Sequence, residues 1–257
     1  MAYQIKGKKG QMTIWIIVAL ALVGAIIIFF LFRGTREPIL DQSVGENPKS
    51  FIADCVKRNV NDVVDEMLIH GGLANPEHVK MHNGININYL CYNSGNYNPC
   101  INEHPMLINE MEKEIKNYIE PKIEECFQNY KIEIGKRQIE IELKPMLLSV
   151  SLGSGKVFVD IERDVAIKQR GESYNLNDFD SEVSSPIYDL GNIAIEIANQ
   201  EAEYCYFENV GYGILYPKFT ILRNALSDSS VIYIIEEKRS EKKMNIAIRS
   251  CAIPAGL

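Results

Sequence analysis

The hydrophobic positions of this chain form one uninterrupted block near the N-terminus, followed by periodic patterns. Residues 14–32 read IWIIVALALVGAIIIFFLF, which is 19 consecutive positions without a charge or a proline. At about 1.5 Å per residue, such a helix nearly crosses a bilayer core of about 30 Å. A helix of a soluble core keeps one polar face, whereas this block is apolar all round. We therefore predict a transmembrane helix over residues 11–33, in contact with lipid through residues 14–32.

A cleaved secretory signal is the main alternative for this block. The apolar stretch is longer than the usual signal core of about 7–15 residues, and no A-x-A cleavage site follows it. We therefore expect the helix to remain in the chain as an anchor.

Helical periodicity appears three times after the block. Residues 34–47 contain Pro38 and Gly45 without any period, and we interpret them as a linker. A helix is predicted from Asn47-Pro48 to Gly71-Gly72, since Asn caps and Pro starts helices while Gly ends them. A second is predicted from residue 105 to about 129, with Pro121 expected to kink or split it. A third begins at Ser185-Pro186 and carries apolar residues to Cys205.

Between and after these helices the period changes to two, which is typical of half-buried strands. One strand is predicted at 85–92, alternating positions continue from Ile139 to Ile167, and closing strands are predicted at 219–222, 231–236 and 244–251. Gly153-Ser154-Gly155 forms a hairpin turn within the alternation. The pattern predicts an α+β exterior domain, 48–257, with an antiparallel meander; a helical part, 48–129, and a sheet-rich part, 130–257, are an alternative division.

Charge gives the membrane orientation. The whole chain carries a net charge of −7, but four of its 27 basic residues (Lys6, Lys8, Lys9 and Arg33) lie in the first 33 residues, which contain no acid. That leaves 23 basic against 34 acidic side chains in residues 34–257, a net of −11. The positive-inside rule places residues 1–10 in the cytoplasm and residues 34–257 outside. An acidic exterior suits neither nucleic acid nor an anionic headgroup surface, so we expect no nucleic-acid partner.

All six cysteines follow the membrane segment, as expected for disulfides in an oxidising compartment. They are Cys55, Cys91, Cys100, Cys126, Cys205 and Cys251. Fifteen pairings are open, and buried free thiols remain an alternative for some of the six. Cys91 and Cys100 bracket a short loop and form the most plausible local pair. For the others we predict Cys55–Cys126 and Cys205–Cys251.

Candidate catalytic chemistry is sparse. His78 and His82 are four residues apart, which on a helix would allow both to bind one metal ion, although Pro76 and Gly84 leave little room for that helix. The oxygen-rich residues 175–182 lack the glycine and glutamate of an EF-hand and are interpreted as a loop before the third helix. No phosphate loop, nucleophile elbow or dinucleotide motif is present in the sequence, and we predict no cofactor.

Tyrosines cluster between Tyr204 and Tyr216. An aromatic binding surface is one interpretation of the cluster, and we prefer core packing, in which the rings are buried and the hydroxyls reach the protein surface.

One motif bears on function. Lys8-Lys9-Gly10-Gln11 is followed by Met12-Thr13 and opens directly into the apolar block. This opening resembles the class III signal of archaeal type IV pilin-like proteins, over about 25 residues. The resemblance implies cleavage between Gly10 and Gln11 and an apolar helix that forms the core of a filament. Trp15 stands where that family has an assembly glutamate, and Ala19 replaces a leucine. The layout is also similar to single-pass archaeal surface proteins with a cysteine-bearing exterior domain.

Three functions follow as hypotheses. The first is a membrane-anchored surface protein whose exterior domain binds other molecules or forms part of the envelope. The second is a pilin-like subunit that is processed before Gln11 and self-assembles through its apolar helix. The third is an anchored metal-dependent hydrolase. Nothing in the sequence favours an enzyme over a binding protein.

Overall fold

The computed structural model describes residues 22–23 and 47–253 of the chain. The chain divides into two compact units, Met1–Glu46 and Asn47–Leu257. The predicted stub (1–10), transmembrane helix (11–33) and linker (34–47) lie outside the described residues, apart from Leu22, Val23 and Asn47. Among the residues that are described, none of the helices has both the length and the apolar character needed to cross a bilayer.

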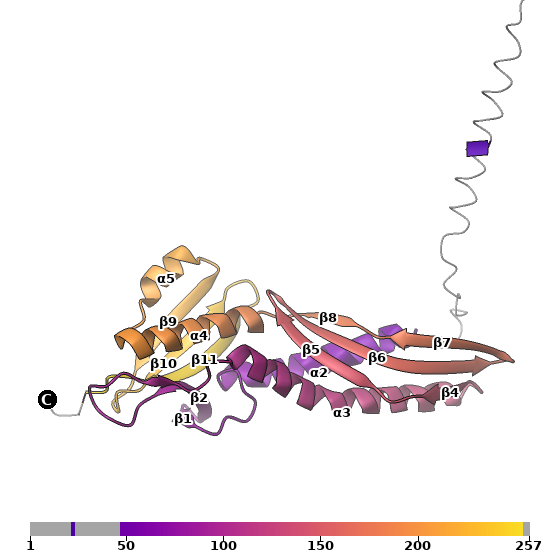
Figure 1. The fold of residues 1–257 in the computed structure, drawn as a ribbon, viewed down its shortest axis with the longest axis horizontal. Helices are drawn as coiled ribbons and strands as arrows, with labels where there is room; N and C mark the ends of the chain where they lie inside the picture. The colour runs from indigo at the N-terminus through magenta and orange to yellow at the C-terminus, as the bar shows by residue number, and fades with distance from the viewer. Residues whose placement is uncertain (1–21, 24–46, 254–257) are drawn as a thin grey trace, which may run out of the picture. The chain divides into compact units, whose positions relative to one another are not determined.

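Residues 47–253 have an α+β fold, as predicted, and this described part contains four helices rather than about three (Figure 1). They are α2 (Pro48–Ile69), α3 (Leu107–Gly135), α4 (Ile187–Tyr204) and α5 (Asn209–Leu215). The predicted start of α2 is confirmed, because Asn47 Oδ1 accepts a hydrogen bond from the Lys49 N–H at 3.0 Å and Pro48 opens the helix. Helix α5 has no counterpart in the predicted pattern.

Pro121 does not split the second predicted helix. Helix α3 passes through the proline as one element and continues to Gly135, six residues beyond the predicted end. Pro121 is exposed, whereas Ile119 and Ile123 on either side are fully buried. Packing of this apolar face holds the helix together across the missing backbone hydrogen bond, since tertiary contacts override local propensity.

Six strands form the first sheet, called sheet one. They are β1 (Val79–His82), β2 (Ile85–Tyr92), β3 (Ile101–Asn102), β9 (Phe219–Ala225), β10 (Val231–Glu237) and β11 (Lys242–Arg249). The order is β1-β2-β11-β10-β9, with β3 also paired to β2. Every pairing is antiparallel except that of β2 with β11, which is parallel. The predicted strand at 85–92 and all three closing strands are confirmed.

The other five strands form sheet two, which is the predicted meander. They are β4 (Glu140–Leu143), β5 (Leu147–Gly153), β6 (Lys156–Gln169), β7 (Glu172–Asp178) and β8 (Ser181–Ser184). Strand β6 is central: β4 and β5 follow each other along one edge, and β7 and β8 follow each other along the other. The sheet is therefore three strands wide and antiparallel throughout. The central strand is continuous, and each outer one is divided into two segments. The oxygen-rich residues 175–182 lie mostly in β7 and β8, so their interpretation as a loop is wrong.

The helices join the two sheets into one body. Helices α2 and α3 run side by side, with α2 behind the strands of sheet two in the view of Figure 1; α3 contacts β4 and β5, while α2 contacts β8 of sheet two and β11 of sheet one. Helix α4 covers β2, β10 and β11. Residues 48–129 therefore have no separate helical core, and the alternative division is not seen.

Candidate functional site

Three disulfides connect the six cysteines in the predicted pairs. Cys55–Cys126 joins α2 to α3, Cys91–Cys100 closes the loop after β2, and Cys205–Cys251 joins the end of α4 to the end of β11. None of the six is a free thiol. The described part of the chain is thus cross-linked twice at sheet one and once between its two longest helices.

The structure does not place His78 and His82 on a helix. His78 precedes β1 and His82 ends it, so the two are separated by four steps of extended chain, or about 13 Å. Within residues 47–253, there is no group of three or more His, Cys, Asp or Glu side chains that could hold a metal ion.

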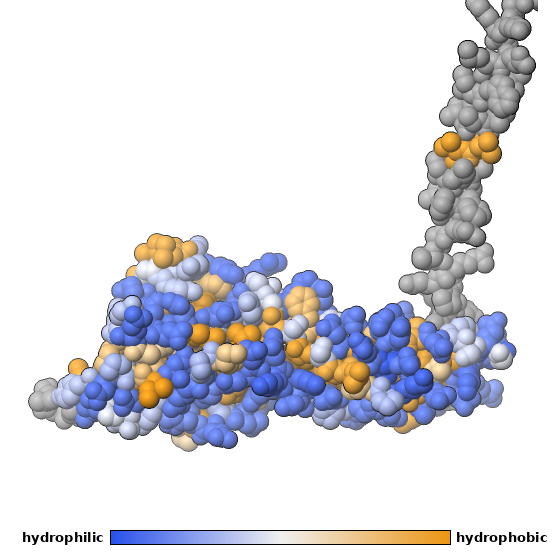
Figure 2. All heavy atoms as spheres, in the orientation of Figure 1, coloured by the Kyte–Doolittle hydropathy of each residue, from blue (hydrophilic) through white to orange (hydrophobic). Residues whose placement is uncertain are grey.

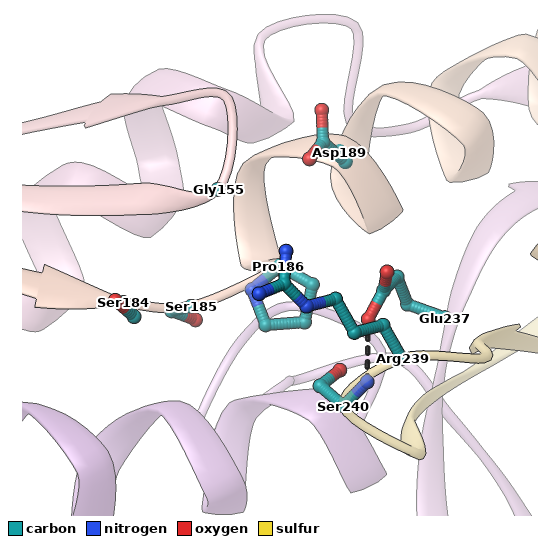
Figure 3. A pocket seen from close by; sticks show the side chains of 8 residues that line it. All are labelled: Gly155, Ser184, Ser185, Pro186, Asp189, Glu237, Arg239 and Ser240. Carbon is teal, nitrogen blue, oxygen red and sulfur yellow. Dashed lines mark hydrogen bonds between the residues drawn. The ribbon is translucent and has the colours of Figure 1, made fainter. Parts of the chain in front are cut away.

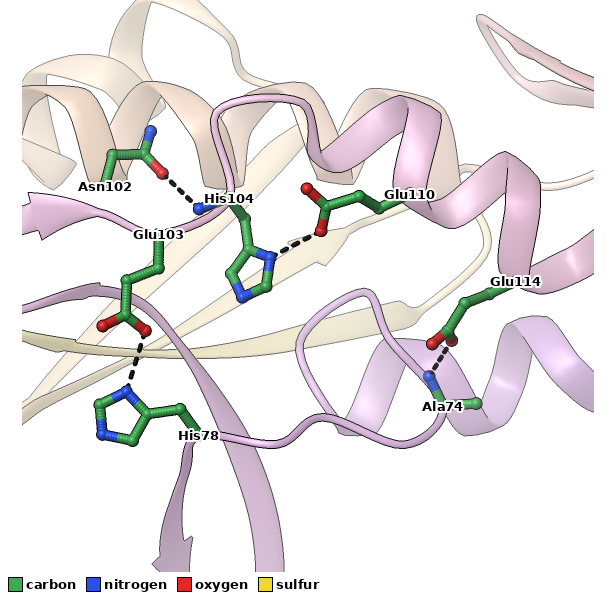
Figure 4. Close-up of polar contacts among 7 residues, drawn as sticks. All are labelled: Ala74, His78, Asn102, Glu103, His104, Glu110 and Glu114. Carbon is green, nitrogen blue, oxygen red and sulfur yellow. Dashed lines mark hydrogen bonds and ion pairs between the residues drawn. The ribbon is translucent and has the colours of Figure 1, made fainter.

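His78 and His104 pair with carboxylates instead (Figure 4). His78 Nδ1 lies 2.9 Å from Glu103 Oε2, and His104 Nδ1 lies 2.6 Å from Glu110 Oε2. The Ala74 N–H donates to Glu114 of α3. These contacts connect the loops before β1 and after β3 to each other and to α3, so they give His78 and His104 a structural role.

A shallow pocket of about 330 Å³ lies where the first turn of α4 meets the turns of both sheets (Figure 3). Gly155, from the hairpin predicted in sheet two, forms one side of it, and Asp189, Glu237 and Arg239 bring charges of both signs. Glu237 Oε2 accepts a hydrogen bond from the Ser240 N–H at 2.7 Å. The lining contains no histidine or cysteine, and its remaining polar residues are Ser184, Ser185 and Ser240.

The tyrosine cluster differs from the prediction that it packs in the core. Phe207 is fully buried and Tyr212 is half-buried, but Tyr204, Tyr206 and Tyr216 are exposed. Core packing is therefore wrong for three of the four tyrosines. The sequence could not separate the two interpretations, because the spacing of tyrosines around the end of a helix does not show which of them face the core and which face solvent.

Helix α5 adds aliphatic side chains to these rings. None of its residues is buried, and Ile214 and Leu215 are each 75% exposed. We call the α5 surface the set of exposed side chains Tyr204, Tyr206, Val210, Ile214, Leu215 and Tyr216. Figure 2 shows hydrophobic surface at the outer end of α5, bordered by hydrophilic surface. A cluster of exposed aliphatic and aromatic side chains is a feature that interaction sites share.

The segment that carries the α5 surface is firmly held. The Glu208 carboxylate caps α5 by accepting from the N–H groups of Val210 and Gly211 at 3.1 and 3.2 Å. Asn209 Nδ2 donates to the Ile221 carbonyl of β9 at 3.1 Å. The ring of Phe207 packs edge-on against Tyr233 of β10, with centroids 5.9 Å apart. The apolar side chains are therefore presented by an ordered element.

A buried carboxyl lies beneath this segment. Glu201 of α4 is 2% exposed and accepts a hydrogen bond from the Tyr233 hydroxyl, whose oxygen in turn accepts from Arg223 Nε at 3.3 Å. Burial raises the pKa of Glu201, although the Tyr233 hydrogen bond acts against that rise. Burial and the neighbouring carboxyl raise the pKa of Tyr233 as well. Neither group reaches the surface, so ionisation of Glu201 should affect the stability of the fold.

Replacing Glu201 with glutamine should weaken the pH dependence of stability. A carboxyl whose pKa is raised by folding binds its proton more tightly in the folded state, so stability falls as pH rises from the unfolded pKa through the folded one. Glutamine cannot ionise and still offers an oxygen to Tyr233. Urea unfolding at pH 5 and pH 8 should show a smaller loss for Glu201→Gln than for the wild type. Glu196→Gln, on the exposed face of α4, should retain the wild-type loss; equal losses in all three proteins would contradict the role of Glu201.

The chain was compared with protein families, curated proteins and solved structures. No family model, curated protein or solved structure matches this chain significantly.

Proposed function

We propose that the chain is a membrane-anchored cell-surface protein whose folded part acts outside the cell as a binding module. The observation that carries the proposal is the complete pairing of the six cysteines in the part that follows the apolar block. Disulfides form and persist in oxidising compartments, so the pairing supports an exterior location. The uncharged residues 14–32 and the basic residues before them support anchoring with the N-terminus inside.

The α5 surface supports a binding role for the exterior part. It places Val210, Ile214 and Leu215 in water beside three tyrosines, whereas neither the polar pocket nor the histidine–carboxylate pairs assemble a nucleophile and a base. Exposed apolar side chains on a well-held element are the feature that binding surfaces share.

Cell fractionation tests the anchoring. The full chain should stay in the membrane pellet after alkaline washing, and protease added to intact cells should cleave residues 47–253 or release them. A variant lacking residues 14–32 should leave the pellet. An exterior part that is protected from protease until the cells are lysed would contradict the proposal, as would a deletion variant that stays in the membrane.

A pilin-like filament subunit is the second candidate, favoured by the basic residues followed by Gly10-Gln11 and the apolar block. Intact mass separates the two candidates. A purified protein that retains residues 1–10 supports the anchored protein, whereas a chain that begins at Gln11, together with filaments in the electron microscope, supports the pilin-like subunit.

A further inference from the structure

The α5 surface is small, convex and aliphatic at its centre. Val210 and Ile214 are one helical turn apart on α5, with Leu215 beside them, and all three are exposed. Tyr204, Tyr206 and Tyr216 flank them. A stable protein interface needs about 20–30 residues on each side, several times the six residues of this surface. Insertion of a few aliphatic side chains into a lipid surface requires no such area.

Charge around the α5 surface differs from that of the exterior part as a whole. Residues 34–257 carry a net charge of −11, but residues 209–225 contain Lys218 and Arg223 and no acid. The acids next to the surface are Glu203 and Glu208, which interact with the hydroxyls of Tyr204 and Tyr206. Lys218 Nζ lies 3.8 Å from Asp189 Oδ2. Lys218 and Arg223 therefore offset only part of the charge of Glu203, Glu208 and Asp189, so the repulsion from an anionic headgroup layer is smaller here than over the acidic exterior as a whole, and insertion depends on the apolar side chains.

The length of the segment between the apolar block and the folded part limits how far α5 can be from a bilayer that the chain crosses. The 13 residues 34–46 span at most about 45 Å when extended. A tether of this length keeps the folded part at high effective concentration near any bilayer that the chain crosses. Weak insertion at α5 is then enough for contact.

From these observations we propose that the α5 surface docks onto the lipid bilayer in which the chain is anchored. Val210, Ile214 and Leu215 enter the boundary between headgroups and acyl chains, and the tyrosines lie at headgroup level, where aromatic rings with a polar end are stable. The docking rests on the proposed anchoring, because the tether supplies the proximity. It would hold the folded part against the membrane rather than away from it.

Tryptophan fluorescence of the full chain tests the docking. Trp15 is the chain's single tryptophan, so Trp15→Phe gives a background without tryptophan emission. In that background Leu215→Trp reports on α5. Leu147→Trp, on β5 of sheet two, is a matched control because Leu147 is 68% exposed and Leu215 is 75% exposed. Each protein is reconstituted into vesicles of phosphatidylcholine and phosphatidylglycerol, with or without bromine on the acyl chains.

Docking predicts that the tryptophan at 215 emits at shorter wavelength than in water and is quenched about twofold by brominated lipid, whereas the tryptophan at 147 is not quenched. Adding Ile214→Ser should reduce the quenching. Emission at 215 that is unshifted and unquenched overturns the docking. A shifted emission that brominated lipid does not quench and that grows with protein density overturns it too, in favour of a second copy of the chain.

The native Trp15 separates failure of the docking from failure of the anchor. Trp15 lies within the apolar block, so brominated lipid should quench it in the wild-type chain if the block crosses the bilayer. Quenching of Trp15 without quenching at 215 rejects only the docking. Absence of quenching at Trp15 rejects the proposed anchoring and the docking with it.

Discussion

Replacing both Cys55 and Cys126 with alanine should lower the free energy of unfolding by about 4 kcal/mol, more than loss of either other disulfide. The cysteines are 71 residues apart, and the conformational entropy that a cross-link removes from the unfolded chain grows with the loop it closes. The bond also joins α2 to α3, whose apolar faces pack together and reach both sheets. Urea unfolding of residues 47–257 with and without the pair measures the loss.

The disulfide between Cys91 and Cys100 is the matched control. It closes a loop of only nine residues, so its removal by the same two alanines should cost about 3 kcal/mol or less. Cys205–Cys251, with a separation of 46, should fall between the two. If loss of Cys91–Cys100 lowers the free energy of unfolding as much as loss of Cys55–Cys126 does, the length of the closed loop does not determine how much each disulfide stabilises the fold.

Gly71→Ala should destabilise the fold by about 2–3 kcal/mol, because two costs add at this residue. Gly71 follows α2 with φ of +89°, a conformation that side chains with a Cβ rarely adopt. A Cβ there would lie 3.0 Å from the Asn245 carbonyl oxygen and 3.0 Å from the Asn88 Cβ. Neither atom can rotate away as the end of a flexible side chain can. The midpoint of urea unfolding, with an unchanged slope, is the measurement.

Gly84→Ala separates the two costs. Gly84, in the turn between β1 and β2, has a similar φ of +81°, but a Cβ there would meet no atom within 4 Å. Its substitution should cost only the backbone term, about 1 kcal/mol. The difference between the two variants then measures the close approach of α2 to sheet one. Equal losses would show that the contact at Gly71 relaxes freely.

Local signals predicted those parts of the fold that local physics controls. Asn47-Pro48 marked the start of α2 because capping acts within one turn, and the Gly153–Gly155 turn marked the hairpin between β5 and β6 because turn geometry depends on a few residues. The cysteine pairs followed partly from spacing. The α+β class followed from the change of period along the chain.

Features decided by distant contacts could not be predicted in the same way. Helix α3 runs through Pro121 because its buried face packs on sheet two, and α5 was missed because Gly211 and Gly213 hide its helical pattern. The exposure of Tyr204, Tyr206 and Tyr216 depends on where α5 lies against β9, which sequence spacing does not encode. The sequence therefore showed the tyrosine cluster of the candidate site, but it did not show that the cluster lies on the surface.

The parallel pairing of β2 with β11 has a consequence for the order of folding. In this pairing Ala247 lies opposite Tyr89, so the last strand of the chain inserts between β2 and β10. Sheet two, whose strands follow one another within residues 140–184, can form while the rest of the chain is still being made. Sheet one cannot close until β11 has left the ribosome, because contacts between residues so far apart form late and slowly. Until then β2 and β10 expose unpaired strand edges, and the nascent protein is most prone to aggregation in the interval before β11 arrives.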